Sequence, residues 1–303
     1  MSADQLTADE IRDVNTRYHD TAAEHYDAKW GIDFGAEGNR QVVGKLRKAL
    51  GGRPLGPFER SLEIGAGTGY FTLNLLRAGI VRDAVATDIS PGMLRTLEDN
   101  ARRLRVPVTT RVADGEDLPF EDESFNLVFG HAVLHHLPDL RRAFAEFARV
   151  LRPGGTLVFA GEPSRVGDRL AAVPKRAAVR AAPVWRALMR ARAARNPGGH
   201  GDSDPSLEHH VDVHAFVPRD LESFAHGAGL TDTRVRGEEL LANWFGWANR
   251  TLESSAEQSD IPWAWIQYAY RGYLLLQQVD SRLLEPRLPP AVFYNLMVSA
   301  RRL

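Results

Sequence analysis

The 303-residue sequence contains no cysteine. Disulfides, thiolate-bound zinc and iron–sulfur clusters are therefore excluded, and so is a cysteine nucleophile. The sequence also lacks a long apolar run, because no stretch approaches the roughly 18 uninterrupted apolar residues of a membrane helix. Its first ten residues are polar and acidic, without the basic start and apolar run of a secretion signal. We therefore expect a soluble, cytoplasmic protein.

An excess of charge of either sign is also missing. The 38 basic and 39 acidic side chains give a net charge of -1, so no global positive field gathers nucleic acid or an anionic membrane. Local patches of charge remain open. With 44% hydrophobic and 25% charged residues, the composition is that of a globular protein with a sizeable core. We expect one domain over residues 1–303 and do not expect a nucleic-acid partner.

Short β-rich runs alternate with helical runs in the first half of the chain. A capping box at Thr7-Ala8-Asp9-Glu10 predicts a helix through about Trp30, and a second helix is predicted over 40–50; together these form an N-terminal cap, 1–52. The predicted strands of the core, 58–163, are 61–64, 84–87, 108–112, 125–129 and 156–160. The predicted helices between them are 71–78, 93–104 and 140–151. This alternation predicts a parallel sheet with right-handed crossovers.

The second half of the chain has a different character. Residues 164–208 form a basic insertion, predicted as short helices broken by Pro174 and Pro183 and followed by a mobile loop over 196–206. Residues 209–303 are expected to complete the sheet and to carry a helical insertion, 240–286. The further elements predicted there are a helix over 219–229 and strands over 231–236 and 292–300.

The strongest motif is a glycine-rich turn between an apolar strand and a helix, with the sequence SLEIGAGTGYF over 61–71. Glycines at such a turn allow positive φ angles and let a ligand approach the backbone, with helix N–H groups facing it. The dinucleotide-binding fingerprint requires a glycine at its sixth place, where this chain has Tyr70. A nicotinamide oxidoreductase is therefore disfavoured.

Carboxylates end the next two predicted strands. Asp88 follows the second strand, where a carboxylate can accept both hydroxyls of a ribose. Asp114 follows the third strand, and the series continues with the helix-turn-strand sequence RVLRPGGTL over 149–157. Together with the glycine turn, these features resemble the small-molecule branch of the class I S-adenosylmethionine-dependent methyltransferases, which includes the ubiquinone and menaquinone C-methyltransferases. The resemblance is close over about 18–163 and looser over 216–229 and the last strand.

This resemblance implies an α/β fold: a Rossmann-like, doubly wound, mostly parallel seven-stranded sheet with an antiparallel last strand, capped by the N-terminal and inserted helices. It also implies S-adenosylmethionine as the cofactor and a methyl transfer reaction. Without cysteine, the routes through a thiolate adduct or an iron–sulfur radical are excluded. The resemblance assigns cofactor contacts to these positions: Tyr18, Tyr26, Glu63, Gly65, Ala66, Gly67, Gly69, Asp88, Ile89, Met93, Asp114, Gly115, Glu116 and His131.

Most of the assigned residues also have a simpler interpretation. Asp88 would hold the ribose and Asp114 would receive the adenine amine, but either acid is also explained as a solvated loop residue. Met93 would pack on the adenine. For Met93, Tyr18 and Tyr26, however, packing in the protein core explains the residue type nearly as well as contact with the cofactor. The glycines and Glu63 have turn formation as their alternative.

Three histidines follow the fourth predicted strand. His131 would face the sulfonium and the acceptor, and it is the candidate catalytic residue because a histidine can act as a general base near neutral pH. The alternative is a polar wall of the pocket, and His135 and His136 are interpreted as structural. Further on, His210, Asp212 and His214 would share one face of an extended segment and could bind a metal. The resemblance favours an ordinary polar segment there, so no metal is expected.

The acceptor is inferred from the character of the insertions. Aromatic residues gather in the second insertion: Trp244, Phe245, Trp247, Trp263, Trp265, Tyr268, Tyr270 and Tyr273. They suit a small hydrophobic acceptor such as a quinone, lipid or polyketide, although they also suit attachment of the insertion to the sheet. The first insertion carries nine basic residues against Asp168 over 165–195, which resembles an amphipathic helix at a membrane surface. The alternative is a solvated helical lid.

Two other functions remain open. An RNA or protein methyltransferase would use the arginine run for docking, but no Asn/Asp-Pro-Pro-Tyr/Phe tetrapeptide follows the fourth strand, where GHAV stands over 130–133. A non-catalytic protein that binds S-adenosylmethionine would keep the same acidic residues, because these serve binding and not transfer. The sequence predicts neither the methylated atom nor the oligomeric state.

Overall fold

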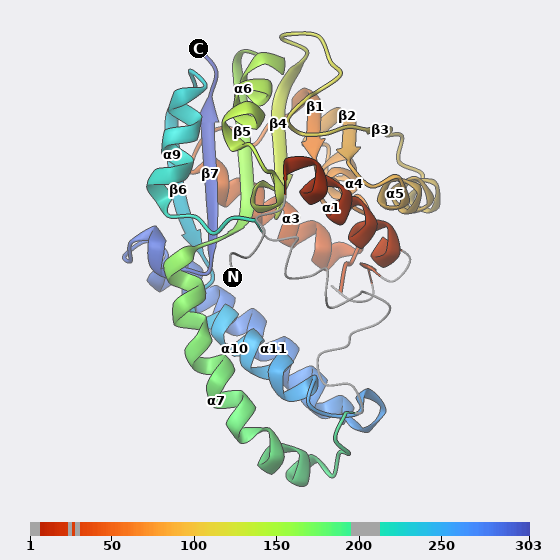
Figure 1. Ribbon diagram of the computed structural model, residues 1–303, viewed down its shortest axis with the longest axis vertical. Coiled ribbons are helices and arrows are strands. Elements are labelled where there is room, and N and C mark those ends of the chain that lie inside the picture. Colours follow the sequence, from red (N-terminus) through yellow and green to blue (C-terminus); the bar gives the residue numbers. More distant parts are fainter. Residues whose placement is uncertain (1–6, 24–25, 28–30, 195–212) are drawn as a thin grey trace.

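The computed structural model describes residues 7–23, 26–27, 31–194 and 213–303 (Figure 1). Seven strands form one sheet in the order β3-β2-β1-β4-β5-β7-β6. Their bounds are β1 Phe58–Ile64, β2 Val81–Asp88, β3 Thr109–Val112, β4 Phe125–His131, β5 Leu151–Pro163, β6 Thr231–Glu238 and β7 Asn295–Arg301. β1 to β5 pair in parallel, and β7 is antiparallel to both neighbours. The predicted mostly parallel sheet with an antiparallel last strand is confirmed.

Helices cover both faces of this sheet. Their bounds are α1 Ala8–Ala22, α3 Ala36–Leu50, α4 Tyr70–Arg77, α5 Pro91–Leu104, α6 Leu140–Val150, α7 Arg165–Met189, α9 Pro218–Gly227, α10 Leu241–Glu253 and α11 Trp263–Val279. Strand β4 has helices packed on both of its faces. Leu127 and Phe129 pack with α3 and α4 on one face, and Val128 packs with α6 and α9 on the other. A strand buried on both faces requires apolar residues at consecutive positions.

The first predicted helix ends earlier than expected. The Thr7 capping box is present, with the Glu10 amide donating to the Thr7 hydroxyl and the Thr7 amide donating to the Glu10 carboxylate, but α1 ends at Ala22. Part of the predicted run, 24–25 and 28–30, lies outside the described residues. The second helix begins at Ala36, before the predicted start, where Asp33 accepts the amides of Gly35 and Gly38.

The basic insertion forms one long helix, so the prediction of short helices broken by proline was wrong. α7 runs for 25 residues with Pro174 and Pro183 inside it. A proline within a helix costs about 3 kcal/mol because it removes a hydrogen bond and crowds the preceding turn. Contacts outside the helix offset this cost: α7 buries Ala178, Ala182 and Trp185, and it packs along α10. Tertiary packing here overrides the local signal of the prolines.

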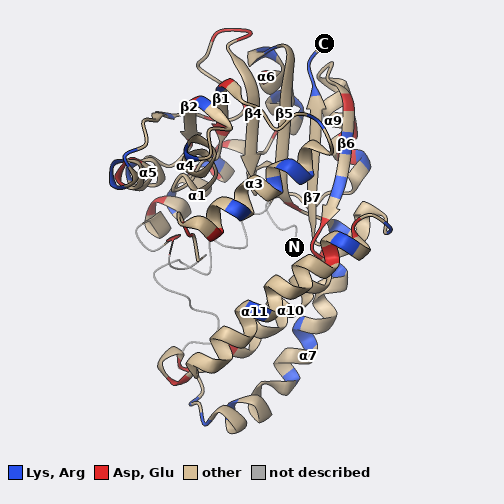
Figure 2. Cartoon of the chain, turned by 180° about the vertical axis from the view of Figure 1, so that it is seen from behind, with Lys and Arg blue, Asp and Glu red and all other residues tan. Residues whose placement is uncertain are grey.

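The inserted helices α7, α10 and α11 form an arm that extends away from the sheet (Figure 1). α10 packs against both α7 and α11, and α7 lies on the outer, convex side of the arm in both ribbon views (Figures 1 and 2). The 3-10 turn Pro290–Val292 then leads into β7, which begins at Asn295 and not at 292 as predicted. Within the described parts of the chain, no helix is both long and apolar enough to cross a membrane.

Candidate functional site

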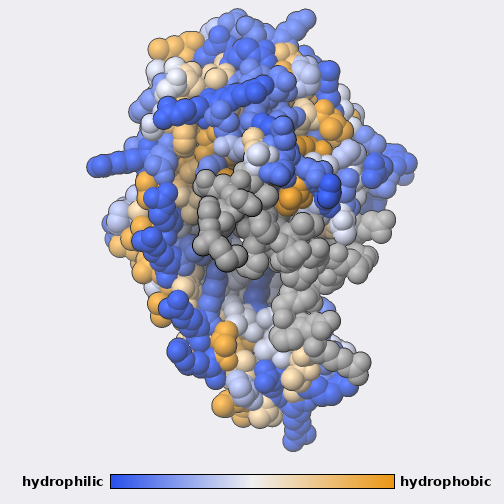
Figure 3. Space-filling view, in the orientation of Figure 1, coloured by the Kyte–Doolittle hydropathy of each residue, from blue (hydrophilic) through white to orange (hydrophobic). Residues whose placement is uncertain are grey.

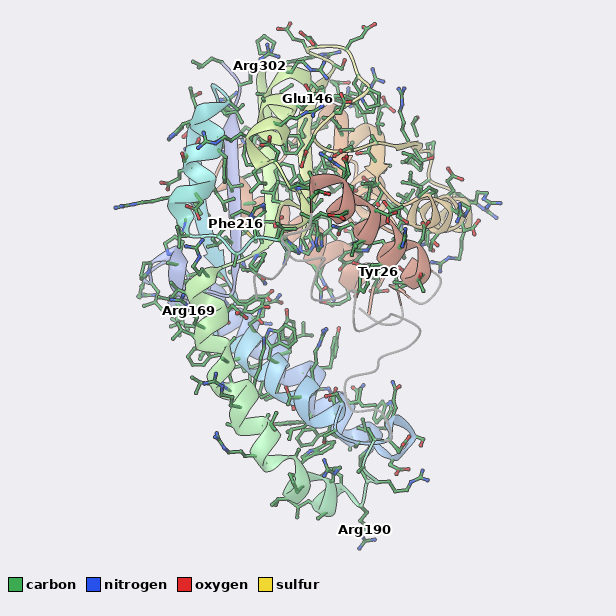
Figure 4. All side chains as sticks on the ribbon, viewed as in Figure 1. Tyr26, Glu146, Arg169, Arg190, Phe216 and Arg302 are labelled. Atoms are coloured by element: carbon green, nitrogen blue, oxygen red, sulfur yellow. The ribbon has the colours of Figure 1, made fainter. Side chains whose placement is uncertain are left out.

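A cavity lies at the carboxyl ends of the first four strands, under the N-terminal helix α1. This is the edge of an open α/β sheet where ligands bind, beside the point at which the strand order reverses between β1 and β4. Its walls are formed by Arg12, Asn15, His19, Tyr26, Ile64, Gly65, Gly67, Asp88, Ile89, Met93, Ala113, Asp114, Gly115, His131, Ala132, Val133, His136, Leu137 and Pro138. Figure 4 labels Tyr26 beside α1.

The cavity brings together most of the residues predicted to contact the cofactor. Those on its wall are Tyr26, Gly65, Gly67, Asp88, Ile89, Met93, Asp114, Gly115 and His131. The others, which do not line it, are Tyr18, Glu63, Ala66, Gly69 and Glu116. Cofactor contact at each of these positions stays a prediction.

The glycine-rich turn after β1 depends on glycine for two different reasons. Gly65 has a φ of 64°, and a Cβ added there would lie 2.4 Å from Val133 Cγ2, so a side chain would collide with the turn that follows β4. Gly67 has a φ of 52°, and no heavy atom of the described residues lies within 4 Å of its added Cβ, so backbone conformation alone requires glycine there. The turn therefore presents bare backbone to the cavity.

Asp88 joins this turn to the next one. One of its carboxylate oxygens accepts the Gly67 amide at 2.8 Å, and the other accepts the Ser90 amide at 2.9 Å. The side chain is largely buried, and burial raises the pKa of Asp88 while His19 and the two amides act in the opposite direction. Each oxygen keeps a second lone pair for a donor in the cavity.

Glu63 lies beneath the turn and does not reach the cavity wall. Its carboxylate accepts the Thr72 amide at 3.0 Å and also bonds the Thr72 hydroxyl, which ties β1 to the first turn of α4. Burial raises the pKa of Glu63 to about 8, against the lowering effect of the Thr72 contacts. The residue thus fixes the geometry of the loop between β1 and α4.

Helix α1 supplies three wall residues that the sequence analysis missed. Arg12, Asn15 and His19 are spaced by three and four positions, so they share one face of the helix. This spacing was the feature of the sequence from which the three residues could have been predicted to lie together. Asn15 donates its amide to the Ile11 carbonyl at 3.0 Å, but its buried Oδ1 has no hydrogen-bond partner among the residues that the structure describes. A buried acceptor on a cavity wall is suited to a ligand that brings a donor.

Ionic and hydrogen-bonding contacts hold both ends of α1 to the sheet edge. Near its start, Arg12 Nε lies 2.7 Å from Asp114 Oδ2, and the same guanidinium pairs with the buried Glu116. Near its end, Asp20 accepts the Ser90 hydroxyl at 2.5 Å and the Gly92 amide at 2.7 Å, at the start of α5. Asp114, predicted to receive the adenine amine, therefore already has Arg12 as a partner.

His131 is held as a neutral side chain. Its Nε2 lies 3.5 Å from Lys45 Nζ, and its ring stacks on Phe71 with centroids 4.6 Å apart. Burial lowers the pKa of His131 to about 3, and the neighbouring Lys45 contributes to this lowering. Lys45 in turn pairs with the buried Glu238 at 2.8 Å. A histidine with this pKa accepts a proton only weakly at neutral pH.

This environment predicts a specific pH dependence of stability. Folded His131 takes up a proton near pH 3, but the unfolded side chain does so near the ordinary histidine pKa of 6.5, so below pH 6.5 the unfolded state binds more protons. The contribution of neutral His131 to the free energy of unfolding should therefore be complete above pH 6.5. Below pH 6.5 it should fall by about 1.4 kcal/mol per pH unit until the pH nears 3. We expect His131→Phe to have a shallower acid limb in urea unfolding measured from pH 7 to pH 4.

The exposed His226 on α9 provides the control. His226→Phe should keep the acid limb of the wild type, and identical limbs for the wild type and His131→Phe would contradict the neutral state of His131.

The turn after β4 is organised by one buried carboxylate. Glu162, on β5, accepts the amides of Val133, Leu134 and His135 at 3.0 to 3.2 Å, and it bonds His135 Nδ1 at 2.8 Å. His135 is thus a structural residue of this turn. His136 instead lies on the cavity wall, with its ring 5.6 Å from that of His19.

The metal hypothesis for the later histidines concerns residues that are only partly described. His210 and Asp212 lie outside the described residues. His214 packs on the turn after β4, where its Nε2 lies 3.0 Å from the Leu137 carbonyl oxygen.

The residues of the cavity fit the cofactor that the sequence resemblance implies. Asp88 offers two carboxylate oxygens suited to a ribose diol, and Asn15 Oδ1 offers a buried acceptor for which the described part of the chain supplies no donor. Ile89, Met93 and Leu137 provide an apolar wall suited to a flat base. Such a mixture of apolar walls and a few placed polar groups is typical of a nucleoside site.

Comparison with known proteins identifies the family. The family model described as "Methyltransferase domain" matches residues 62–159. A demethylmenaquinone methyltransferase of Corynebacterium urealyticum is 35% identical over 174 residues, which cover 57% of this chain and 70% of that protein. A malonyl-[acyl-carrier protein] O-methyltransferase of Methylococcus capsulatus is 37% identical over 160 residues, covering 49% and 58% of the two chains.

A solved structure supports the fold over the whole chain. Phosphoethanolamine N-methyltransferase 2 of Haemonchus contortus, in complex with S-adenosyl-L-methionine, aligns with a TM-score of 0.59 at 18% identity, covering 100% of this chain and 61% of that one. The chain spans about half the length of the curated relatives that it matches first. The sheet order, the glycine turn and Asp88 agree with one family, and the demethylmenaquinone methyltransferase is covered over 70% of its length. The chain therefore belongs to the class I S-adenosylmethionine-dependent methyltransferases.

Proposed function

We propose that this protein transfers a methyl group from S-adenosylmethionine to a small hydrophobic acceptor. The observation that carries the proposal is the Asp88 carboxylate, hydrogen-bonded to the glycine turn and lining a cavity that α1 covers. When bound, the cofactor supplies a methyl group already activated on a sulfonium. The protein then needs mainly to align the acceptor and to exclude water.

The cavity residues divide this task. Asp88 binds the ribose hydroxyls, Met93 packs on the base, and Asn15 Oδ1 accepts a hydrogen bond from the ligand. α1 excludes water from above, since Arg12 and Asp20 attach it to the sheet edge. Each group acts by binding or by positioning.

His131 serves in this proposal as a neutral wall of the pocket and not as the general base. Its stacking on Phe71 fixes the ring plane, and Lys45 beside Nε2 favours the tautomer that carries its proton on Nδ1. The ring can then donate a hydrogen bond to an acceptor oxygen or nitrogen. This role replaces proton abstraction, for which a pKa of about 3 is unsuited.

A hydrophobic acceptor is favoured by the aromatic side chains of the arm. Phe245 and Tyr268 pack with ring centroids 5.6 Å apart, and Trp265 lies 5.2 Å from Tyr268. Tyr273 reaches back toward the sheet, where its hydroxyl donates to Glu239 at 2.8 Å. The arm is thus anchored beside β6 with aromatic residues along it, which suits a quinone, lipid or polyketide-like acceptor.

The test has two stages. Calorimetry first measures S-adenosylmethionine binding to the folded protein, for which micromolar affinity is expected. Mass spectrometry then follows one added methyl group, together with S-adenosylhomocysteine, on a panel of hydroquinones, fatty acids, phenolic polyketides, mixed RNA and a protein extract. Methylation of a hydrophobic member supports the proposal. Turnover only with RNA or protein, or binding without turnover on any member, supports the two rival functions instead.

A further inference from the structure

Helix α7 carries two apolar stripes, and only one of them is covered. The covered stripe faces the rest of the protein and consists of small residues and one tryptophan: Gly167, Ala171, Ala178, Ala182 and Trp185. A helix on the surface of a globular protein ordinarily has one such stripe and a polar opposite face. The second stripe of α7 therefore needs a separate explanation.

The second stripe runs along the outer side of the helix. Its members are all exposed and are spaced by four, four, three and four positions: Val173, Ala177, Ala181, Val184 and Leu188. This spacing places them on one line along the helix. Val173, Val184 and Leu188 are 67%, 65% and 72% exposed, so three branched aliphatic side chains project into solvent. Figure 3 shows hydrophobic and hydrophilic residues alternating along this edge of the molecule.

A row of arginines lies beside this stripe. Arg169, Arg176 and Arg180 are exposed on the neighbouring line of the helix. In the described part of the chain none of the three has an ion pair with an acid, and the acid nearest in sequence, Asp168, pairs with Lys175 at 3.6 Å. Figure 2 shows the basic residues along α7, and Figure 4 labels Arg169 and Arg190 toward its two ends.

The far end of the arm adds an exposed aromatic side chain. Trp263, the first residue of α11, is 72% exposed, as is Leu188 near the end of α7. Trp185 and Trp265 pack with ring centroids 5.1 Å apart and tie the two helices together at this end. Tryptophan is the residue most suited to the boundary between water and lipid, because its ring is apolar and its N–H is polar.

We propose that the outer face of α7, together with Trp263, docks this protein on the surface of an anionic lipid bilayer. The aliphatic stripe enters the boundary between headgroups and acyl chains, and the arginine row lies at the level of the lipid phosphates. A bilayer fits better than a folded partner, because the stripe lies on the convex side of the arm, with its aliphatic side chains projecting. It fits better than nucleic acid, because the net charge is -1 and three aliphatic side chains line the basic row.

The test is flotation of the full-length protein with lipid vesicles. The wild type should float with vesicles of phosphatidylcholine mixed with phosphatidylglycerol, much less with phosphatidylcholine alone, and less as salt is raised. The triple variant Arg169→Gln/Arg176→Gln/Arg180→Gln should lower the partition coefficient on anionic vesicles by roughly a hundredfold. The triple variant Val173→Ser/Val184→Ser/Leu188→Ser should lower it by roughly tenfold or more.

The control variant removes the same charge elsewhere: Arg95→Gln/Arg141→Gln/Arg219→Gln, at exposed positions on α5, α6 and α9. Its partition coefficient on anionic vesicles should lie within about twofold to threefold of the wild-type value, because charge far from the lipid surface is screened. All three variants should unfold at the temperature of the wild type and bind S-adenosylmethionine equally. Failure of the wild type to float, an equal loss in the control, or capture by RNA or an acidic protein without vesicle binding would overturn the proposal.

Discussion

Replacement of Asp88 by alanine is expected to weaken S-adenosylmethionine binding by roughly ten- to hundredfold. The variant loses a charge-assisted contact to the ligand, for which the cost is about 1.5–3 kcal/mol. It also leaves the amides of Gly67 and Ser90 without their acceptor, so the two turns that form the cavity wall are no longer joined. Calorimetric titration with S-adenosylmethionine and with S-adenosylhomocysteine measures the effect, and both ligands should lose affinity alike.

Asp83 on the same strand supplies the matched control, since its side chain is exposed and pairs only with Arg60 among the described residues. Asp83→Ala should bind as the wild type does. Equal affinities for Asp88→Ala and the wild type, with both proteins folded, would show that the ligand does not lie against this strand end.

Among the single substitutions described above, replacement of Glu162 by alanine should lower the free energy of unfolding the most. The carboxylate is fully buried and is the acceptor for three consecutive backbone amides and for His135. Each buried donor left without a partner costs about 1–3 kcal/mol, so the free energy of unfolding should fall by about 3–5 kcal/mol in urea titrations. Affinity for S-adenosylmethionine should fall too, because Val133 belongs to both this turn and the cavity wall.

Glu162→Gln keeps the shape and one acceptor oxygen, so it should lose clearly less stability than Glu162→Ala. If both variants unfolded like the wild type, contacts other than those of Glu162 would hold the turn after β4.

The sheet could be predicted from the sequence because its signals are local. Each parallel strand is a short apolar run between turn residues, and the glycine turn after β1 and Asp88 after β2 mark two strand ends directly. Helix α7 could not be predicted in the same way. Pro174 and Pro183 are strong local signals for a break, and only the contact with α10, which is distant in sequence, makes a continuous helix favourable.

The cavity was predicted unevenly for a similar reason. Residues at strand ends were found, because parallel strands end at one edge of a sheet. Arg12, Asn15 and His19 were missed, since the helical period says which side chains share a face but not which part of the fold that face covers. His131 lies on the cavity wall, and its contact with the cofactor stays a prediction. Its chemical state depends on Lys45, which lies 86 positions earlier in the chain and cannot be paired with it by spacing.

The attachment of α1 has a kinetic consequence. We expect a ligand bound under this helix to leave more readily when Arg12 separates from Asp114 or when Asp20 releases the start of α5. In the proposed reaction, the lifetime of the bound state would therefore depend on contacts that are not made to the reacting atoms. Because one of these contacts is a partly exposed ion pair, we expect ionic strength to act on the dwell time of the ligand more directly than on the proposed methyl transfer.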